Sequence, residues 1–514
     1  MNQRSALVRR YLFLCATILV ASAMLGSVPD AAAVTVSHCT DTGMCPGTGA
    51  CSIDGTVNVV PGSVLDCGTR SVTLEGTGTL RVVDGEFTLI TGAFTINGPG
   101  GYINGDEGSE DQPPGVTVIA SGTVTIGGKI RMSGNHGGGA ISITTTSTNA
   151  DIVMTSSGDD GIECRALAAN QDGGEVLLSA GRDIIISDPI DADGADSGYG
   201  HGGTVELRAG GNVTTNADGW ITAQGRADGG GTVRIITSTG DITLNQTIDA
   251  YGRSETGDGG LVELHAGDAL AINQIIDVRG GVNDAGGTAA GGTIDIEAGC
   301  GGLTIAANLV ATGGSEGEDQ EPGAIVATAL GPMTVASGIT LDTHALAFGG
   351  DGGLINLDGL GAVVLSTNAL LDARGNTTTN SDGKGATIRV AGCTVDIQSG
   401  AKLDTRGITG GSIDLAALAL APESGTQPLR VSTGAQLKVA GTYNGSIDLG
   451  ALHYKPGDCS NNGDCFLNSD CTKGCETGTC SAANPDTAGV NTPFDVAPSR
   501  FSDKHLAPCT TACN

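Results

Sequence analysis

Aspartate recurs at one position of a short motif, [IL]-D-A-x-G, along much of this 514-residue chain. The carboxylates at this position belong to Asp191, Asp249, Asp277, Asp342, Asp372 and Asp404. Stacked carboxylates supply the oxygen ligands that Ca²⁺ prefers, so the first three residues of this set are candidate calcium ligands. The alternative is that each carboxylate accepts hydrogen bonds from amides of the following turn. Thr222, Val310 and Lys438 interrupt the series, which favours the alternative.

The aspartate motif closes a larger repeat that begins with paired glycines. The strings GGEVLLSAG at 173, GGTVELRAG at 202 and GGLVELHAG at 259 share one template, and most copies start 25 to 35 residues apart. In GGTVELRAG, apolar and charged residues alternate, which places Leu207 on one face of a strand and Glu206 on the other. Three short strands per unit of about 30 residues, with glycine at the corners and no helical period, predict one coil of a parallel β-solenoid.

Stacking of such coils makes equivalent residues neighbours, one strand spacing apart. Glu206, Arg234 and Glu263 would then form a ladder of alternating charge, which Asp295 interrupts. Glycine after each aspartate motif is expected where positive φ or the close approach of the next coil excludes a Cβ atom. The repeated glycine pairs predict about 11 or 12 coils, which at one strand spacing per coil would make a rod about 50 to 60 Å long.

Composition limits both the core and the partners. The chain has 86 glycines and only 14 aromatic residues, so the predicted core is thin and repetitive. It is not collagen, because the glycines follow no G-X-Y period. The formal net charge of −31 repels phosphate backbones, so nucleic acid is not an expected partner. Divalent cations and cationic surfaces are compatible with this negative charge.

The two ends of the chain differ from the repeats. Residues 1–33 combine a basic start, an apolar stretch and an Ala31-x-Ala33 cleavage site, which predicts an export signal. After its removal we expect no transmembrane span. The predicted divisions that follow are a cysteine-containing N-terminal cap at 34–70, β-helix repeats at 71–452 and a cysteine-rich segment at 453–514.

Cysteines cluster in the two terminal segments, and export would bring them into an oxidising compartment that favours disulfides. Zinc binding by these thiols is disfavoured, because no Cys-x-x-Cys pair is present. The seven cysteines of the C-terminal segment cannot all pair among themselves. The disulfide candidates are Cys39, Cys45, Cys51, Cys67, Cys459, Cys465, Cys471, Cys475, Cys480, Cys509 and Cys513.

The GG-x-[VI]-x-[IL]-x-A-G unit followed by [IL]-D-A-x-G resembles the β-helical repeats of filamentous-haemagglutinin-type adhesins and other bacterial surface proteins with a pectin-lyase-like solenoid. The resemblance covers residues 115–450 and implies an all-β, single-stranded, right-handed parallel β-helix, a handedness that parallel crossovers also favour. It further implies a secreted or cell-surface protein of a Gram-negative bacterium, in the periplasm or on the outer surface. Its expected role is structural or adhesive, with extracellular glycans or other surface proteins as partners and no resident cofactor.

Pectin-lyase-like solenoids also include polygalacturonases and lyases. Asp159 and Asp160 in GDDG, and His201 in GHG, resemble two short motifs of polygalacturonase-type glycosidases. In this alternative the paired carboxylates act as acid and base at a glycosidic bond, and the histidine orients them. The Asn-Thr-Asp motif of those enzymes is absent, and both strings arise readily in a chain rich in glycine and aspartate. The sequence therefore favours a structural role over a carbohydrate-active enzyme.

Overall fold

The fold was analysed in a computed structural model. The described residues are 36–39, 45, 47–59, 62–82, 85–98, 100–105, 114–155, 161–254, 256–281, 289–313, 322–345, 350–375, 383–417, 429–439 and 445–451. Residues 1–33 and 453–514, predicted as the export signal and the cysteine-rich segment, lie outside them. Throughout the described part the secondary structure is strand, with no helix, and accordingly no helix there is long and apolar enough to cross a membrane.

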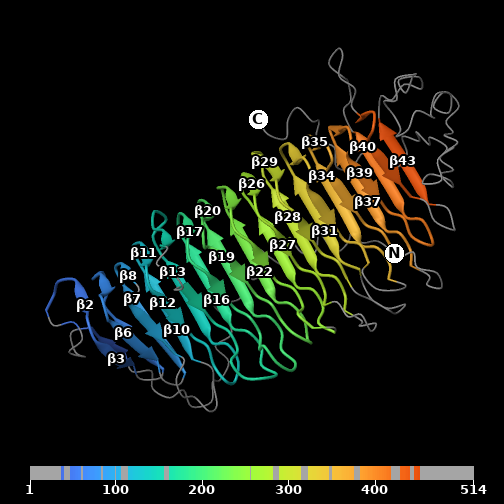
Figure 1. Ribbon diagram of the computed structural model, residues 1–514. Helices are drawn as coiled ribbons and strands as arrows, with labels where there is room; N and C mark the ends of the chain where they lie inside the picture. Colours follow the sequence, from blue (N-terminus) through green and yellow to red (C-terminus); the bar gives the residue numbers. More distant parts are fainter. Residues whose placement is uncertain are drawn as a thin grey trace, which may run out of the picture.

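The strands form three parallel sheets, and each coil contributes one strand to each sheet in turn (Figure 1). The first sheet has 15 strands, and the second and third have 14 each. Strand neighbours within a sheet are three positions apart in strand order, which is the connectivity of a single chain wound as a β-solenoid. The predicted fold class, with three short strands per coil, is confirmed.

The first sheet contains the longest strands of the coil, mostly of six residues. Its strands are β1 (Val36–His38), β4 (Ser63–Asp66), β7 (Glu86–Thr91), β10 (Gly115–Ala120), β13 (Ala140–Thr145), β16 (Glu175–Ala180), β19 (Thr204–Ala209), β22 (Thr232–Thr237), β25 (Leu261–His265), β28 (Thr293–Ala298), β31 (Ala324–Ala329), β34 (Leu354–Gly359), β37 (Thr387–Gly392), β40 (Ser412–Ala417) and β43 (Ser446–Ala451).

The second sheet is built from strands of three or four residues. These are β2 (Cys51–Ile53), β5 (Val72–Leu74), β8 (Phe94–Ile96), β11 (Val124–Ile126), β14 (Ile152–Met154), β17 (Ile184–Ile186), β20 (Val213–Thr215), β23 (Ile242–Leu244), β26 (Ala269–Ile272), β29 (Gly302–Ile305), β32 (Met333–Val335), β35 (Ala362–Leu365), β38 (Thr394–Ile397) and β41 (Leu429–Val431).

The third sheet carries the aspartate motif. Its strands are β3 (Thr56–Val59), β6 (Thr79–Val82), β9 (Tyr102–Asn104), β12 (Lys129–Arg131), β15 (Gly161–Glu163), β18 (Ile190–Asp191), β21 (Ile221–Thr222), β24 (Ile248–Asp249), β27 (Ile276–Asp277), β30 (Leu309–Val310), β33 (Thr340–Asp342), β36 (Leu370–Asp372), β39 (Lys402–Asp404) and β42 (Gln436–Lys438).

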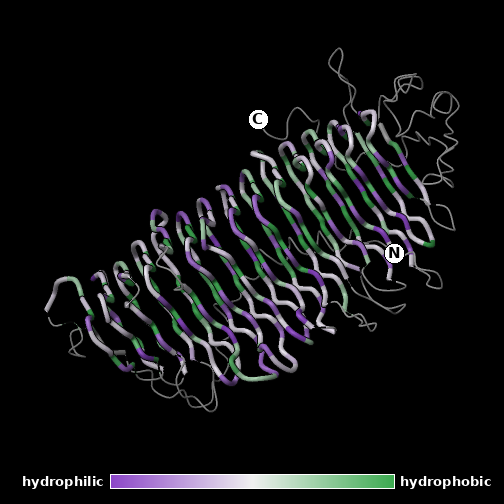
Figure 2. Tube along the Cα trace, viewed as in Figure 1, coloured by the Kyte–Doolittle hydropathy of each residue, from purple (hydrophilic) through white to green (hydrophobic). Residues whose placement is uncertain are grey.

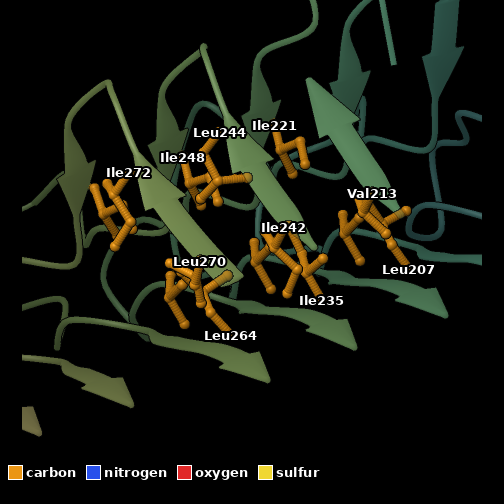
Figure 3. Packing of buried hydrophobic residues seen from close by; sticks show 14 of the residues in the cluster. Leu207, Val213, Ile221, Ile235, Ile242, Leu244, Ile248, Leu264, Leu270 and Ile272 are labelled. Carbon is orange, nitrogen blue, oxygen red and sulfur yellow. The ribbon is translucent and has the colours of Figure 1, made fainter. Parts of the chain in front are cut away.

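The core is a stack of aliphatic layers enclosed by the three sheets (Figure 3). Leu207, Ile235 and Leu264 occupy the same inward position of consecutive first-sheet strands, and each is fully buried. Apolar stripes therefore run along the rod from coil to coil (Figure 2). The outward ladder predicted from Glu206 through Arg234 and Glu263 to Asp295 has the expected register. In these middle coils aliphatic side chains fill the lumen, whereas Phe87 and Phe94 are buried in the core near the N-terminal end of the rod.

The stack is longer than the 11 or 12 coils predicted from glycine pairs, because it begins well before the first such pair. Strands β2, β3 and β4, within the segment 34–70, already join the three sheets. Two disulfides, Cys39–Cys67 and Cys45–Cys51, hold this first part of the rod, and each has a Cα–Cα distance of 5.0 Å. The remaining predicted disulfide candidates, those of the tail, lie outside the described residues.

Glycine at the corner after the third sheet is required by close approach and not by positive φ. A Cβ atom on Gly225 would lie 1.4 Å from the carbonyl oxygen of Gly229, and one on Gly252 would lie 2.1 Å from that of Gly257. Neither glycine has positive φ. Gly225 and Gly252 also pair directly with each other across adjacent coils. Ala345 occupies the same corner, opposite Gly313, so glycine is not obligatory in every coil.

Candidate functional site: the aspartate column

The predicted aspartates form a continuous column on the third sheet. Register places Asp191 beside Thr222, Thr222 beside Asp249 and Asp249 beside Asp277, and the column continues to the end of the sheet. We call the following set the aspartate column: Asp191, Thr222, Asp249, Asp277, Val310, Asp342, Asp372, Asp404 and Lys438. The sequence thus predicted both its members and its gaps.

The carboxylates of the aspartate column accept backbone hydrogen bonds at the corner, as the alternative to calcium binding predicted. At Asp191, Asp277, Asp342, Asp372 and Asp404 the donor is the amide two residues later, for example Arg279 N–H to Asp277 Oδ1 at 3.1 Å and Asp193 N–H to Asp191 Oδ1 at 3.0 Å. These five corners are therefore Asx-type turns. Three of these side chains are buried, those of Asp277, Asp372 and Asp404.

Cationic side chains two positions before or after the aspartates neutralise most of the C-terminal half of the column. Arg374 donates to Asp372 through Nε at 2.7 Å and Nη2 at 2.6 Å. Asp404 accepts from Arg406 Nε at 2.8 Å and pairs with Lys402 Nζ at 2.8 Å. Burial alone would raise the pKa of Asp404, but the hydrogen bonds from these two cations lower it below its usual value.

The N-terminal half of the column has fewer cations. Burial, together with the charge of Asp277, raises the pKa of Asp249 to about 6. Burial and the charge of Asp191 likewise raise the pKa of Asp193 to about 6. Arg253 crosses this region and bonds both Asp193 and Asp196, which lie two coils earlier. Like-charged neighbours with raised pKa values form a region that a proton or a cation would stabilise.

A mixed ligand set occurs where β33 and β36 lie side by side. Asp342 pairs in register with Asp372, and His344 follows Asp342 by two residues. One ligand atom from each of these three side chains lies within 4.8 Å of the other two. His344 Nδ1 lies 2.5 Å from Asp342 Oδ1, and this hydrogen bond raises the pKa of His344. This group was not predicted from the sequence, although the histidine stands in LDTHA, where the coils of Asp372 and Asp404 have arginine.

The glycosidase-like residues are only partly described. Asp159 and Asp160 lie outside the described residues, so their position relative to His201 stays a prediction. His201 is an exposed corner residue whose backbone N–H donates to Asp172 Oδ1 at 2.8 Å. It pairs with Gly229 of the next coil, which makes it part of the stacked corner.

Glu163 extends the charged column toward the N-terminus, which sequence reasoning also missed. It lies in register between Arg131 and Asp191. Its carboxylate pairs with Lys129 Nζ at 2.7 Å and Arg165 Nε at 3.5 Å. The sequence gives little indication of Glu163 as a member of the column, because its coil lacks the [IL]-D-A motif.

The side chains of the column can stabilise the corner turns through hydrogen bonds and can balance charge between coils through ion pairs. Where Asp342, His344 and Asp372 meet, they can also offer ligands to a cation. The calcium candidates Asp191, Asp249 and Asp277 stay a prediction. No family model, curated protein or solved structure matches this chain, so the likeness to haemagglutinin-type repeats stays a resemblance.

Proposed function

We propose that this chain is an exported structural and adhesive protein of a bacterial surface or matrix. The observation that carries the proposal is the unbroken stack of in-register strands from β1 to β43. At one strand spacing per coil, the first sheet alone makes a rod roughly 65 Å long. A rod of this kind suits a role in which length and a repeated outer surface matter more than a single pocket.

The outer surface supports binding to extracellular glycans or to other surface proteins. Hydroxyl-bearing side chains recur at the outward position of the second sheet, where Thr73, Thr95 and Thr125 stand in register on consecutive coils, as do Thr214 and Thr243. Rows of hydroxyl groups one strand spacing apart can exchange hydrogen bonds with the hydroxyls of an extended polysaccharide. The repeat of the rod would let many weak contacts add along such a ligand.

Localisation in the native organism tests whether the protein is exported to the cell surface or matrix. Antibody against the rod should label intact cells or the extracellular matrix, and the mature protein should be found in the exported fraction. Retention of the bulk of the protein in the cytoplasm would contradict it.

A glycan array and a polysaccharide-hydrolysis screen on the mature protein test the adhesive role. We expect binding without turnover, and binding that survives His201→Ala. Turnover of a polysaccharide that is lost in Asp159→Asn or Asp160→Asn would instead establish the glycosidase alternative. Retention on neither glycans nor surface-protein fractions would reject the adhesive role.

A further inference from the structure

The side chains of Asp342, His344 and Asp372 carry a ligand set that differs from the rest of the aspartate column. Their ligand atoms, one imidazole nitrogen and two carboxylate oxygens, come from two adjacent coils and lie within 4.8 Å of one another. We propose that these three residues form a binding site for a first-row divalent transition metal such as Zn²⁺. Ca²⁺ prefers a shell of oxygen ligands, so this site is chemically distinct from a calcium ladder.

Without a metal, a hydrogen bond holds His344 Nδ1 against Asp342 Oδ1 at 2.5 Å. A metal would take the place of the shared proton. Tetrahedral ligand atoms about 2.0–2.1 Å from Zn²⁺ are about 3.3 Å apart, so these two atoms need to separate by less than about 1 Å. Side-chain rotation can provide this, because both side chains are partly exposed, at 25% for His344 and 20% for Asp342.

Asp372 is already oriented for the third ligand position. Its side chain is 5% exposed and is held by Arg374, which donates to both carboxylate oxygens. Oδ1 also accepts from the backbone N–H of Arg374 at 3.3 Å, whereas Oδ2 accepts from Nη2 and keeps a further lone pair for a metal. Hydrogen bonding of a ligating carboxylate by an outer side chain is a common feature of metal sites. Arg374 also offsets one negative charge, which leaves the site a single net negative charge when His344 is neutral.

The partial exposure of His344 and Asp342 leaves room for water on the solvent side. Water would complete a four-coordinate shell of one nitrogen and two protein oxygens. A metal here would tie the end of β33 to the end of β36, adding a link between coils to the backbone hydrogen bonds.

Binding of Zn²⁺ to the full chain, stripped of metal with a chelator, tests the proposal by calorimetric titration. The parent should bind Zn²⁺ at this site, and His344→Gln and Asp342→Asn should each weaken that binding at least tenfold. His265→Gln is the matched control, because His265 is a histidine near one carboxylate, with Nδ1 4.0 Å from Glu297 Oε2, and is not in the ligand set. This control should bind Zn²⁺ as the parent does.

Spectroscopy with Co²⁺ in place of Zn²⁺ gives a second readout that misfolding of a variant cannot imitate. The parent and His265→Gln should show d–d absorption bands of a nitrogen–oxygen site, and His344→Gln should lose them while keeping the strand signal in circular dichroism. Excess Ca²⁺ should leave the bands unchanged. The proposal is overturned if the parent fails to bind Zn²⁺ below about 100 μM, or if His344→Gln binds Zn²⁺ and Co²⁺ like the parent.

Discussion

Replacing a corner glycine with valine tests the reason for the glycine column. We consider Gly252→Val, because a Cβ atom there meets the carbonyl oxygen of Gly257 at 2.1 Å and that of Asp258 at 2.7 Å. Ordinary contact begins at 3.4 Å, so the Gly257 carbonyl must retreat by about 1.3 Å. The obstacle is backbone, which cannot swing aside as a flexible side chain could.

The expected cost of Gly252→Val is at the upper end of what overpacking causes, about 3 kcal/mol. If a rod of about 400 residues unfolds as one unit, this loss lowers the melting temperature by about 4 °C. Hydrogen exchange is the sharper assay, because each coil contacts mainly its neighbours and local opening can precede global unfolding. The amide of Gly252 donates to Arg279 O at 3.1 Å, and that of Arg253 donates to Gly225 O at 3.0 Å. Peptides that contain these amides should lose protection.

Gly55→Val is the matched control for Gly252→Val. Nothing lies within 4 Å of the position that a Cβ atom would occupy on Gly55, and its φ is not positive. This variant should melt and exchange like the parent. The close-approach explanation is refuted if Gly252→Val also shows unchanged melting and unchanged exchange at the corner.

Three further perturbations test the charge and cap interpretations. Asp249→Asn removes a carboxyl whose pKa is raised to about 6, mainly by burial. Because the folded state holds this proton more tightly than the unfolded chain, this group costs stability as pH rises from about 4 to about 6. The variant should therefore melt higher than the parent at pH 7.5, with the gain vanishing near pH 4, and a lower melting temperature at pH 7.5 would contradict this. Arg234→Glu sets like charges against Glu206 and Glu263 and should cost about 1 kcal/mol at low salt and less in 1 M NaCl, whereas a loss independent of salt would argue against the ladder. Replacing Cys39 and Cys67 with serine opens a link between residues 28 positions apart and should cost about 2–4 kcal/mol in urea unfolding under non-reducing conditions, so an unchanged midpoint would count against its stabilising role.

Sequence reasoning predicted the features that depend on repetition. Alternation identified the inward face, and the fixed spacing of the motif identified the neighbours within the aspartate column. Both succeed because a solenoid converts sequence period directly into spatial register, as in the pairing of Asp372 with Asp404. The coil count predicted from the glycine pairs was too low, because the segment 34–70 already contributes β2, β3 and β4 to the three sheets. These strands lack the paired glycines on which the count was based.

The chemistry of the column was harder to predict, because it depends on what lies beside each carboxylate. The sequence showed that Asp372 and Asp249 occupy equivalent positions, yet one is clamped by Arg374 and the other faces another carboxylate. The charge balance at Asp372 depends on the residue two positions later in the chain, Arg374, and the pKa of Asp249 depends on Asp277 of the next coil. The Asp-x-Arg and Asp-x-His strings carried this information, and it becomes interpretable only when the corner geometry is known.

The unequal lengths of the connections between sheets have a consequence for how such a molecule can change over evolution. Three residues separate β19 from β20 and five separate β20 from β21, whereas nine separate β21 from β22 and fifteen separate β27 from β28. Length varies most at one edge, between the third sheet and the first. Insertions at that edge can alter the outer contour of the rod while the hydrogen-bonded register of all three sheets is retained. The molecule thus combines a constant winding with one edge of varied loop length, along which new recognition surfaces can arise at little cost to folding.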